Sequence, residues 1–257
     1  MITFPAELLP HLGHNLWHLF AVFLRVSAMV SLLPAFGERS IPARVKLGVA
    51  VAFTIIIMPA IPSADVLPKF PGMAGMIGVE ILIGLLLGIG LRLFVFALQT
   101  AGSIAAQATS LSQILGGAAT EPVPAMGYLL TLAGLALAMF LGLHVRAAQF
   151  MINSYMLFPI GVLPAAPDLS QWGVTQIASS FGLAFALAMP FVIASLIYNL
   201  ALGVINRAMP QLMVAFVGAP AITFAGLFLL FAGTPLILST WSDALFSFLQ
   251  NPLGSVR

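Results

Sequence analysis

The sequence predicts an all-α integral membrane protein, and three observations support this fold class. Apolar residues make up 61% of the 257, charged residues make up only 6%, and long apolar runs alternate with short polar breaks. Soluble domains carry about 25% charged residues, so this chain has too few charges to build a water-facing surface. The runs are continuously apolar, whereas the strands of a β-barrel would alternate. We therefore expect about six to eight hydrophobic helices arranged in hairpins, several of them kinked or broken.

The composition also limits the chemistry. There are no cysteines, which excludes disulfides, thiol catalysis and cysteine metal sites. The net charge of +2 rests on few residues and does not indicate nucleic acid as a partner. The carboxylates are scattered one to a segment, without the motifs of intramembrane hydrolases, metalloproteases or phosphate-binding loops. We expect neither an enzyme nor a bound cofactor.

The first span runs from about Leu12 to Pro34 and carries Arg25. Glu7 and three histidines precede or open it, where a signal peptide would have a basic region, so we expect no cleaved signal. His11, His14 and His18 share one helical face. Three histidines are able to ligate a metal, but no carboxylate or cysteine stands close by. We favour a polar helix end at the membrane interface and expect no metal.

The connection PAFGERSIPARVKLG, residues 34–48, contains the densest charge cluster in the chain. Under the positive-inside rule, its three cations predict a cytoplasmic location. The cluster serves either as a topology signal alone or also as a contact for a partner. Its members are Glu38, Arg39, Arg44 and Lys46.

The second span runs from Val45 to about Ile61, and the third begins at Met73 and reaches about Leu98. Four residues recur every four positions in the third span, namely Glu80, Gly84, Gly88 and Arg92. The two glycines form a small-xxx-small face that permits close helix approach. We expect the flanking charges to be paired within an assembly, and we favour packing over a transport role.

The third helix continues beyond its apolar part as a polar stripe formed by Gln99, Ser103 and Gln107. The segment LGGAATEPVPAMG, residues 115–127, follows soon after and contains two adjacent glycines, Glu121 and two prolines. Such a segment cannot face lipid. It is either an ordered functional loop or a simple extramembrane connector.

The second half of the chain contains longer apolar runs. A fourth span from Tyr128 to Leu143 is followed by a shorter run that ends at FPIG, residues 158–161. The run from Trp172 to Asn206 exceeds the roughly 20 residues that a bilayer needs, so its helix tilts, kinks at Pro190 or extends beyond the membrane.

The last apolar run reaches from Leu212 to about Leu238 and contains Pro220 and Pro235. The tail after it places large apolar side chains on one helical side, which predicts an amphipathic closing helix at an interface. These side chains are Trp241, Leu245, Phe248 and Leu249.

The stretch from Tyr198 to Pro220 contains a charged residue and a proline inside a long apolar run, a combination that indicates a functional or packing role within the membrane. Arg207 is the only charged residue between Asp168 and Asp243, and a lone arginine at mid-bilayer costs about 2.5–3.5 kcal/mol on insertion scales. Pro210 breaks or kinks any helix that reaches it.

Four small or polar residues form a seam on the helix before this break: Ser195, Asn199, Gly203 and Asn206. Lipid cannot satisfy their amides, so the seam either packs against another helix or lines a wet path. Broken helices also occur in secondary transporters, which makes a stand-alone transporter the main alternative.

Five segments together resemble the FliR family, the flagellar members of the type III export-gate proteins, which are related to the SctT subunits of injectisomes. They are GERSIPARVKLG at 37–48, the polar stripe and loop at 107–127, GLHVRA at 142–147, FPIG at 158–161 and NLALGVINRAMPQLMVAFVGAP at 199–220. They occur in the family's order between about residues 15 and 235.

The resemblance implies a single membrane domain over residues 1–257, with a FliP-like portion up to about residue 165 and a FliQ-like portion from 166. It implies one copy of this subunit in an assembly with several FliP-like and FliQ-like subunits, associated with FlhB-like and FlhA-like components. Such an assembly would be the gate in the bacterial inner membrane, at the flagellar basal body, for unfolded flagellar proteins. An injectisome gate subunit is an alternative.

The resemblance also implies a loop that plugs the closed channel and falls on about residues 110–124. Its expected residues are Ser110, Gln113, Gly116, Gly117, Glu121 and Pro122. The sequence has Glu121-Pro122 where the family usually has Asp-Pro. The intramembrane and assembly residues expected beside the plug are Glu38, Arg39, Arg44, Lys46, Glu80, Arg92, Asn199, Asn206, Arg207 and Pro210.

Overall fold

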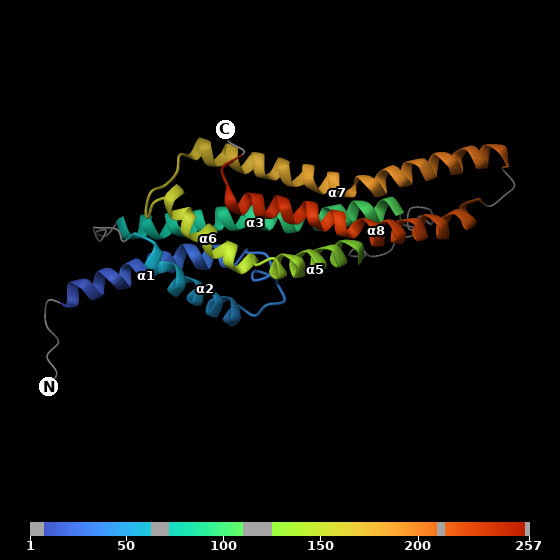
Figure 1. The fold of residues 1–257 in the computed structure, drawn as a ribbon. Coiled ribbons are helices and arrows are strands. Elements are labelled where there is room, and N and C mark those ends of the chain that lie inside the picture. Colours follow the sequence, from blue (N-terminus) through green and yellow to red (C-terminus); the bar gives the residue numbers. More distant parts are fainter. Residues whose placement is uncertain (1–7, 63–71, 110–124, 210–213, 255–257) are drawn as a thin grey trace. The chain divides into compact units, whose positions relative to one another are not determined.

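The computed structural model describes residues 8–62, 72–109, 125–209 and 214–254. This part of the chain contains seven α-helices and one short 3₁₀ turn, in agreement with the predicted number of helices. Figure 1 shows them coloured in chain order. They are α1 (Leu8–Val30), α2 (Ala43–Ile57), η1 (Met58–Ala60), α3 (Gly72–Thr109), α5 (Ala125–Phe140), α6 (Leu143–Leu157), α7 (Ala166–Ala208) and α8 (Val214–Gln250).

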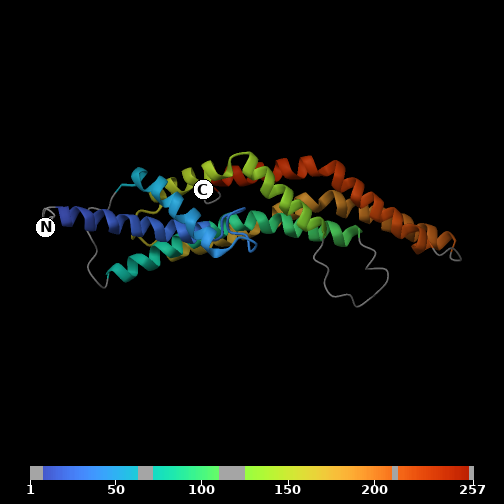
Figure 2. The same cartoon turned by 90° about the horizontal axis from the view of Figure 1, so that it is seen from below.

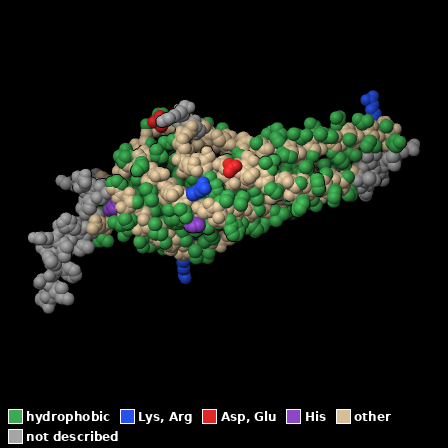
Figure 3. All heavy atoms as spheres, in the orientation of Figure 1, with side chains coloured by type: hydrophobic (Ala, Val, Ile, Leu, Met, Phe, Trp, Pro, Cys, Tyr) green, Lys and Arg blue, Asp and Glu red, His purple; other side chains and the backbone are tan. Residues whose placement is uncertain are grey.

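Among the described residues, four helical segments are long and apolar enough to cross a membrane, or five if α5 and α6 together count as one broken span. The four are Ala43–Ala60, Gly72–Thr109, Ala166–Ala208 and Pro220–Gln250. In the space-filling view of Figure 3, apolar side chains cover much of the visible face and charged groups are few. The prediction of an all-α membrane protein is confirmed.

The long helices follow the predicted runs and extend them. Helix α3 is a single helix of 38 residues, so the apolar span and the polar stripe after it form one element. Helix α7 has 43 residues with Pro190 inside it, and Figure 1 shows its ribbon changing direction about half-way along.

The predicted amphipathic closing helix is present as the last part of α8, not as a helix of its own. Helix α8 continues for 37 residues through Pro220 and Pro235 to Gln250, because a proline removes one backbone donor without preventing a membrane helix from continuing. The expected apolar side of its end does exist, and Trp241, Leu245 and Phe248 are buried. Other side chains of the chain cover this side, so it does not lie free at an interface.

The chain forms two compact units. Unit 1 contains residues 1–92, 141–174 and 248–257, and unit 2 contains residues 93–140 and 175–247. The expected boundary between FliP-like and FliQ-like portions, near residue 165, lies in the connection between α6 and α7 and stays a prediction.

In unit 1, α1 packs against both α2 and α3. Helices α1 and α2 lie side by side in Figures 1 and 2. The small face of α3 meets α1 directly, because a Cβ at Gly84 would clash with the Arg25 carbonyl oxygen and one at Gly88 would lie 3.0 Å from the Leu32 Cβ. The packing role predicted for these glycines is therefore confirmed.

In unit 2, the second half of α3 packs against α5 and α8. Gly102 of α3 and Gly127 of α5 bring the two backbones together, since a Cβ on Gly102 would clash with the Gly127 backbone. Trp241 of α8 is fully buried, and its indole Nε1 donates to the Phe94 carbonyl oxygen at 2.8 Å. A buried indole N–H needs such a partner.

Candidate functional site

The most deeply buried charges in the described residues are Arg25 of α1 and Glu80 of α3, both 0% exposed. They form a bidentate pair, in which Arg25 Nε donates to Glu80 Oε2 at 2.8 Å and Nη2 donates to Oε1 at 3.1 Å. Two parallel charge-assisted hydrogen bonds are the strongest form of this contact. Each charge offsets part of the cost of burying the other, so the two occur together inside apolar helices.

The remaining contacts of Arg25 reach the end of α6. Nη1 donates to the carbonyl oxygens of Ser154 at 3.3 Å and Phe158 at 2.8 Å, and the guanidinium carbon lies 3.9 Å from the centre of the Tyr155 ring. The last carbonyls of a helix carry partial negative charge, and most of them lack partners within it, although the Ser154 carbonyl oxygen also accepts the Phe158 backbone N–H at 2.9 Å. Arg25 therefore stabilises the point at which α6 stops.

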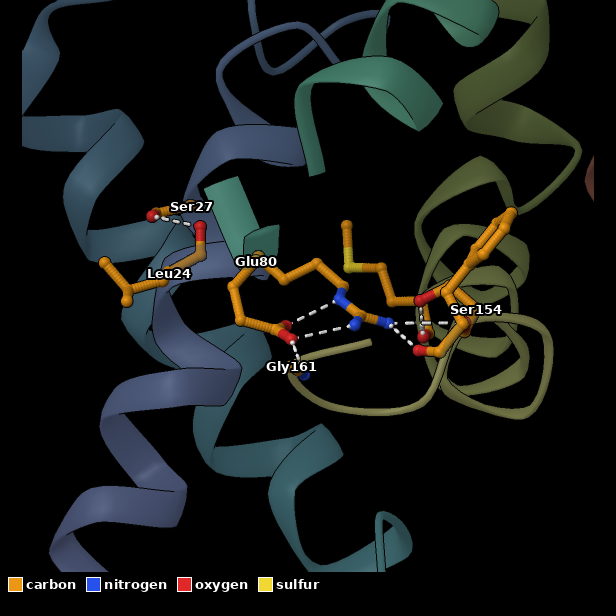
Figure 4. Close-up of polar contacts among 8 residues, drawn as sticks. Leu24, Ser27, Glu80, Ser154 and Gly161 are labelled. Atoms are coloured by element: carbon orange, nitrogen blue, oxygen red, sulfur yellow. Dashed lines mark hydrogen bonds and ion pairs between the residues drawn. The ribbon is translucent and has the colours of Figure 1, made fainter. Parts of the chain in front are cut away.

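Glu80 holds the segment that follows. Its Oε1 accepts a hydrogen bond from the Gly161 backbone N–H at 2.9 Å, and Figure 4 draws this contact between Glu80 and Gly161. Gly161 has a φ of +74°, a backbone conformation that glycine adopts at little cost. One buried ion pair thus fixes α1, α3, α6 and the FPIG segment of unit 1 together.

A second ion pair joins the charged connection to α3. Arg92 Nη1 donates to Glu38 Oε1 at 2.5 Å and Nη2 donates to Oε2 at 3.2 Å, with both side chains partly exposed. Lys46 Nζ donates to the Gly37 carbonyl oxygen at 2.9 Å. Glu80 and Arg92 are therefore paired, as expected. Their partners, Arg25 for Glu80 and Glu38 for Arg92, belong to this same chain.

The other two cations of the connection point outward. Arg39 precedes α2 and Arg44 lies in its first turn, and both are exposed. Their expected role in assembly or topology stays a prediction.

The second half of α7 has a different character. Large apolar side chains are exposed along it, with Leu196 at 68% and Leu200 at 70%. Asn199, Asn206 and Arg207 are exposed on the same half-helix. Asn199 Nδ2 donates to Ser195 Oγ at 3.2 Å, so two members of the predicted seam bond each other along the helix.

The predicted break agrees with the helix boundaries, since α7 ends at Ala208 and α8 begins at Val214. Pro210 itself lies outside the described residues. The expected plug at 110–124, with Ser110, Gln113, Gly116, Gly117, Glu121 and Pro122, also lies outside them. Helix α3 ends at Thr109 just before this segment, and α5 begins at Ala125 just after it.

The histidine face predicted at the start of the first span is only partly described, because the side chains of His11 and His14 lie outside the described part. His18 is buried in α1. Among the described residues, no group of three or more His, Cys, Asp or Glu side chains lies together.

Sequence reasoning missed the partner of Arg25 and the carbonyl acceptors at the end of α6. A signal for the ion pair was present, because Arg25 and Glu80 are lone opposite charges in two apolar spans, and intramembrane charges pair with one another. No sequence pattern marks the Ser154 and Phe158 carbonyls, since every residue has one.

With four or five candidate spans, and a buried ion pair joining its helices, the chain is a multi-pass membrane protein. Residues 16–248 match the family described as Bacterial export proteins, family 1. The chain is 34% identical over 226 residues to the Flagellar biosynthetic protein FliR of Caulobacter vibrioides, which covers 86% of this chain and 90% of that protein.

Two further relatives bear the same name. The protein from Escherichia coli strain K12 is 33% identical over 241 residues, 92% of this chain and 91% of the relative. The protein from Bacillus subtilis strain 168 is 29% identical over 211 residues, 77% of this chain and 79% of the relative. The chain belongs to the FliR family of bacterial export proteins.

Proposed function

We propose that this chain is a subunit of the flagellar protein export apparatus and that, with FliP-like and FliQ-like subunits, it forms an inner-membrane channel for unfolded flagellar proteins. The family and the names of the relatives support the first part of this proposal. The exposed second half of α7 is the observation that carries the second part.

The polar groups in the apolar helices fall into two kinds, those with partners inside the chain and those that are exposed. Arg25 and Glu80 are satisfied by each other and by backbone groups of unit 1. Asn206 and Arg207 are exposed beside exposed Val204 and Ile205 of α7. Neither lipid nor water suits a surface that is both apolar and rich in amides, because lipid leaves amides unsatisfied and water contacts apolar groups unfavourably.

Neighbouring protein helices satisfy both requirements of such a surface. Large side chains pack against the exposed leucines, while polar groups of the partner bond the amides and the guanidinium. Apart from its chain neighbours and the backbone of its own helix, no atom of the described residues lies within 4 Å of where a Cβ on Gly203 would be, so a partner helix is free to approach there. A subunit that assembles with several others supplies these contacts.

The finer parts of the proposal come from the family resemblance. They are the single copy per assembly, the FliP-like and FliQ-like portions, the FlhB-like and FlhA-like components and the plug at residues 110–124. In this proposal the chain is structural, without catalytic residues or a cofactor.

The test is native mass spectrometry of the tagged full chain, purified in mild detergent after co-expression with its chromosomal neighbours. We expect a heteromer with one copy of this chain among several smaller membrane subunits. Arg207→Leu and Asn206→Leu should reduce recovery of the heteromer, while Asp243→Leu, at an exposed charge of α8, should not.

A stable monomer or homodimer under these conditions would contradict the proposal. It would favour a stand-alone secondary transporter, which predicts solute uptake by the purified protein alone in liposomes. Export of virulence proteins in place of flagellar proteins would favour the injectisome alternative.

A further inference from the structure

Unit 1 contains a cavity of about 570 Å³ that opens to the surface. Its inner lining is apolar and includes Leu86 and Leu87 of α3, Phe158 after α6 and Trp172 of α7. Two polar residues also line it, Asp168 in the first turn of α7 and Asn251 just after α8. The volume and the mainly apolar lining with few polar groups are typical of small-molecule sites.

The walls of this cavity are held in place by hydrogen bonds and ring contacts. The Trp172 side chain is buried, its Nε1 donates to the Pro252 carbonyl oxygen at 2.8 Å, and its ring centre lies 6.5 Å from that of Phe248. The Phe158 carbonyl oxygen accepts the 2.8 Å hydrogen bond from Arg25. These contacts fix the positions of Trp172 and Phe158 in the cavity wall.

The polar residues sit where the helices end. Asp168 and Asn251 are both exposed, whereas Leu87 and Trp172 are buried. Within the described ranges, Asp168 belongs to neither of the two ion pairs. A carboxylate in a first turn also interacts favourably with the helix dipole, but this does not account for the apolar cavity beside it.

We propose that this cavity binds a phospholipid whose headgroup carries an amine, with an acyl chain against the apolar lining and the ammonium group at Asp168. An amphiphile fits an apolar interior with a polar mouth, and a membrane protein is surrounded by such molecules. The carboxylate attracts an ammonium group and repels an anionic headgroup. The Asn251 amide is able to donate a hydrogen bond to a phosphate or ester oxygen.

The other candidate occupant is an apolar side chain of a partner subunit. The charge of Asp168 at the mouth favours the lipid. A single phospholipid carries both an amine, which the carboxylate attracts, and a hydrocarbon chain, which the apolar interior accepts. The cavity lies wholly within unit 1, so lipid binding is measurable on this chain alone and does not depend on the proposed assembly.

The experiment incubates the purified full chain in detergent with equimolar phosphatidylethanolamine and phosphatidylglycerol that have the same acyl chains. Native mass spectrometry then counts the retained lipids of each kind. We expect phosphatidylethanolamine to be retained preferentially. Asp168→Asn should lower the ratio of the two lipids about two- to fivefold, the range expected for one exposed ion pair.

Two more variants distinguish the contribution of the headgroup contact from that of the apolar cavity. Asp243→Asn removes an exposed carboxylate of α8 that does not line the cavity, and it should leave the ratio unchanged. Leu86→Trp fills part of the cavity and should reduce retention of both lipids. Asp168→Asn changes only a surface group, so its result stands even if Leu86→Trp fails to fold.

Equal retention of the two lipids by the unchanged protein would overturn the proposal, as would an unchanged ratio in Asp168→Asn. A photo-reactive amino acid in place of Leu253, in the assembled complex in membranes, tests the other occupant. A cross-link to lipid supports the proposal, and a cross-link to another protein subunit overturns it.

Discussion

Removing the carboxylate at position 80 should strongly destabilise the chain. In Glu80→Gln, the Arg25 guanidinium remains buried without a carboxylate beside it. It keeps its contacts with the Ser154 and Phe158 carbonyls and the Tyr155 ring, and the glutamine offers it one neutral oxygen in place of two charged ones. Two charged hydrogen bonds, of 2.8 and 3.1 Å, lose their ionised acceptor. Breaking a buried pair by removing one partner costs about 3–5 kcal/mol, a large share of the roughly 5–15 kcal/mol that stabilises a typical domain.

The assay is thermal unfolding of the purified chain in detergent, followed by circular dichroism at the helix band. With about 2–4 °C per kcal/mol for a chain of this size, we expect the midpoint to fall by about 6–20 °C. Glu38→Gln is the matched control, because it breaks the partly exposed pair with Arg92 and should cost about 1 kcal/mol or less.

A double variant separates the loss of the pair from the loss of a side chain. Arg25→Met with Glu80→Met removes both charges and keeps the volume, and it should be more stable than Glu80→Gln, because no unpaired charge stays buried. The reasoning is refuted if Glu80→Gln and Glu38→Gln unfold at the same temperature, or if the double variant is the least stable of the three.

Three further predictions follow from the packing and from the exposed half of α7. Gly84→Ala should lower the stability of the chain by about 1–3 kcal/mol, because the added methyl group overpacks against α1. Gly78→Ala has open space around the added Cβ and should be neutral or slightly stabilising. Equal thermal unfolding midpoints for the two variants would contradict this. Trp241→Phe should cost about 1–3 kcal/mol, because the Phe94 carbonyl loses its indole partner, and thermal unfolding without a shift would show that this bond contributes nothing. Arg207→Leu should impair motility and flagellar protein secretion while the isolated chain unfolds at its usual temperature, and wild-type secretion would count against the assembly role of α7.

Much of the fold followed from the pattern of apolar runs. The spans at 43–60, 72–109, 166–208 and 220–250 correspond to the runs read from the sequence, because a bilayer demands long apolar helices whatever their tertiary contacts. The close approach at Gly84 and Gly88 was also predictable, since a four-residue spacing places both on one helical face. The amphipathic tail was predicted, but not that it continues α8 without a break, because the end of an apolar run near residue 238 does not show whether the backbone helix also ends there.

By itself, the sequence determined the membrane environment, the helical class, the family and the set of residues that need partners. The tertiary structure decided which partners some of those residues take. Arg25 finds Glu80, 55 residues away, and the carbonyls of Ser154 and Phe158, more than 120 residues away. Local spacing cannot encode such contacts, because they depend on how separate helices are placed beside one another. Periodicity therefore identified the helices and their faces. Packing in three dimensions determined that Arg25, Glu80 and Arg92 of α1 and α3 pair inside the chain, while Arg207 at the end of α7 remains exposed.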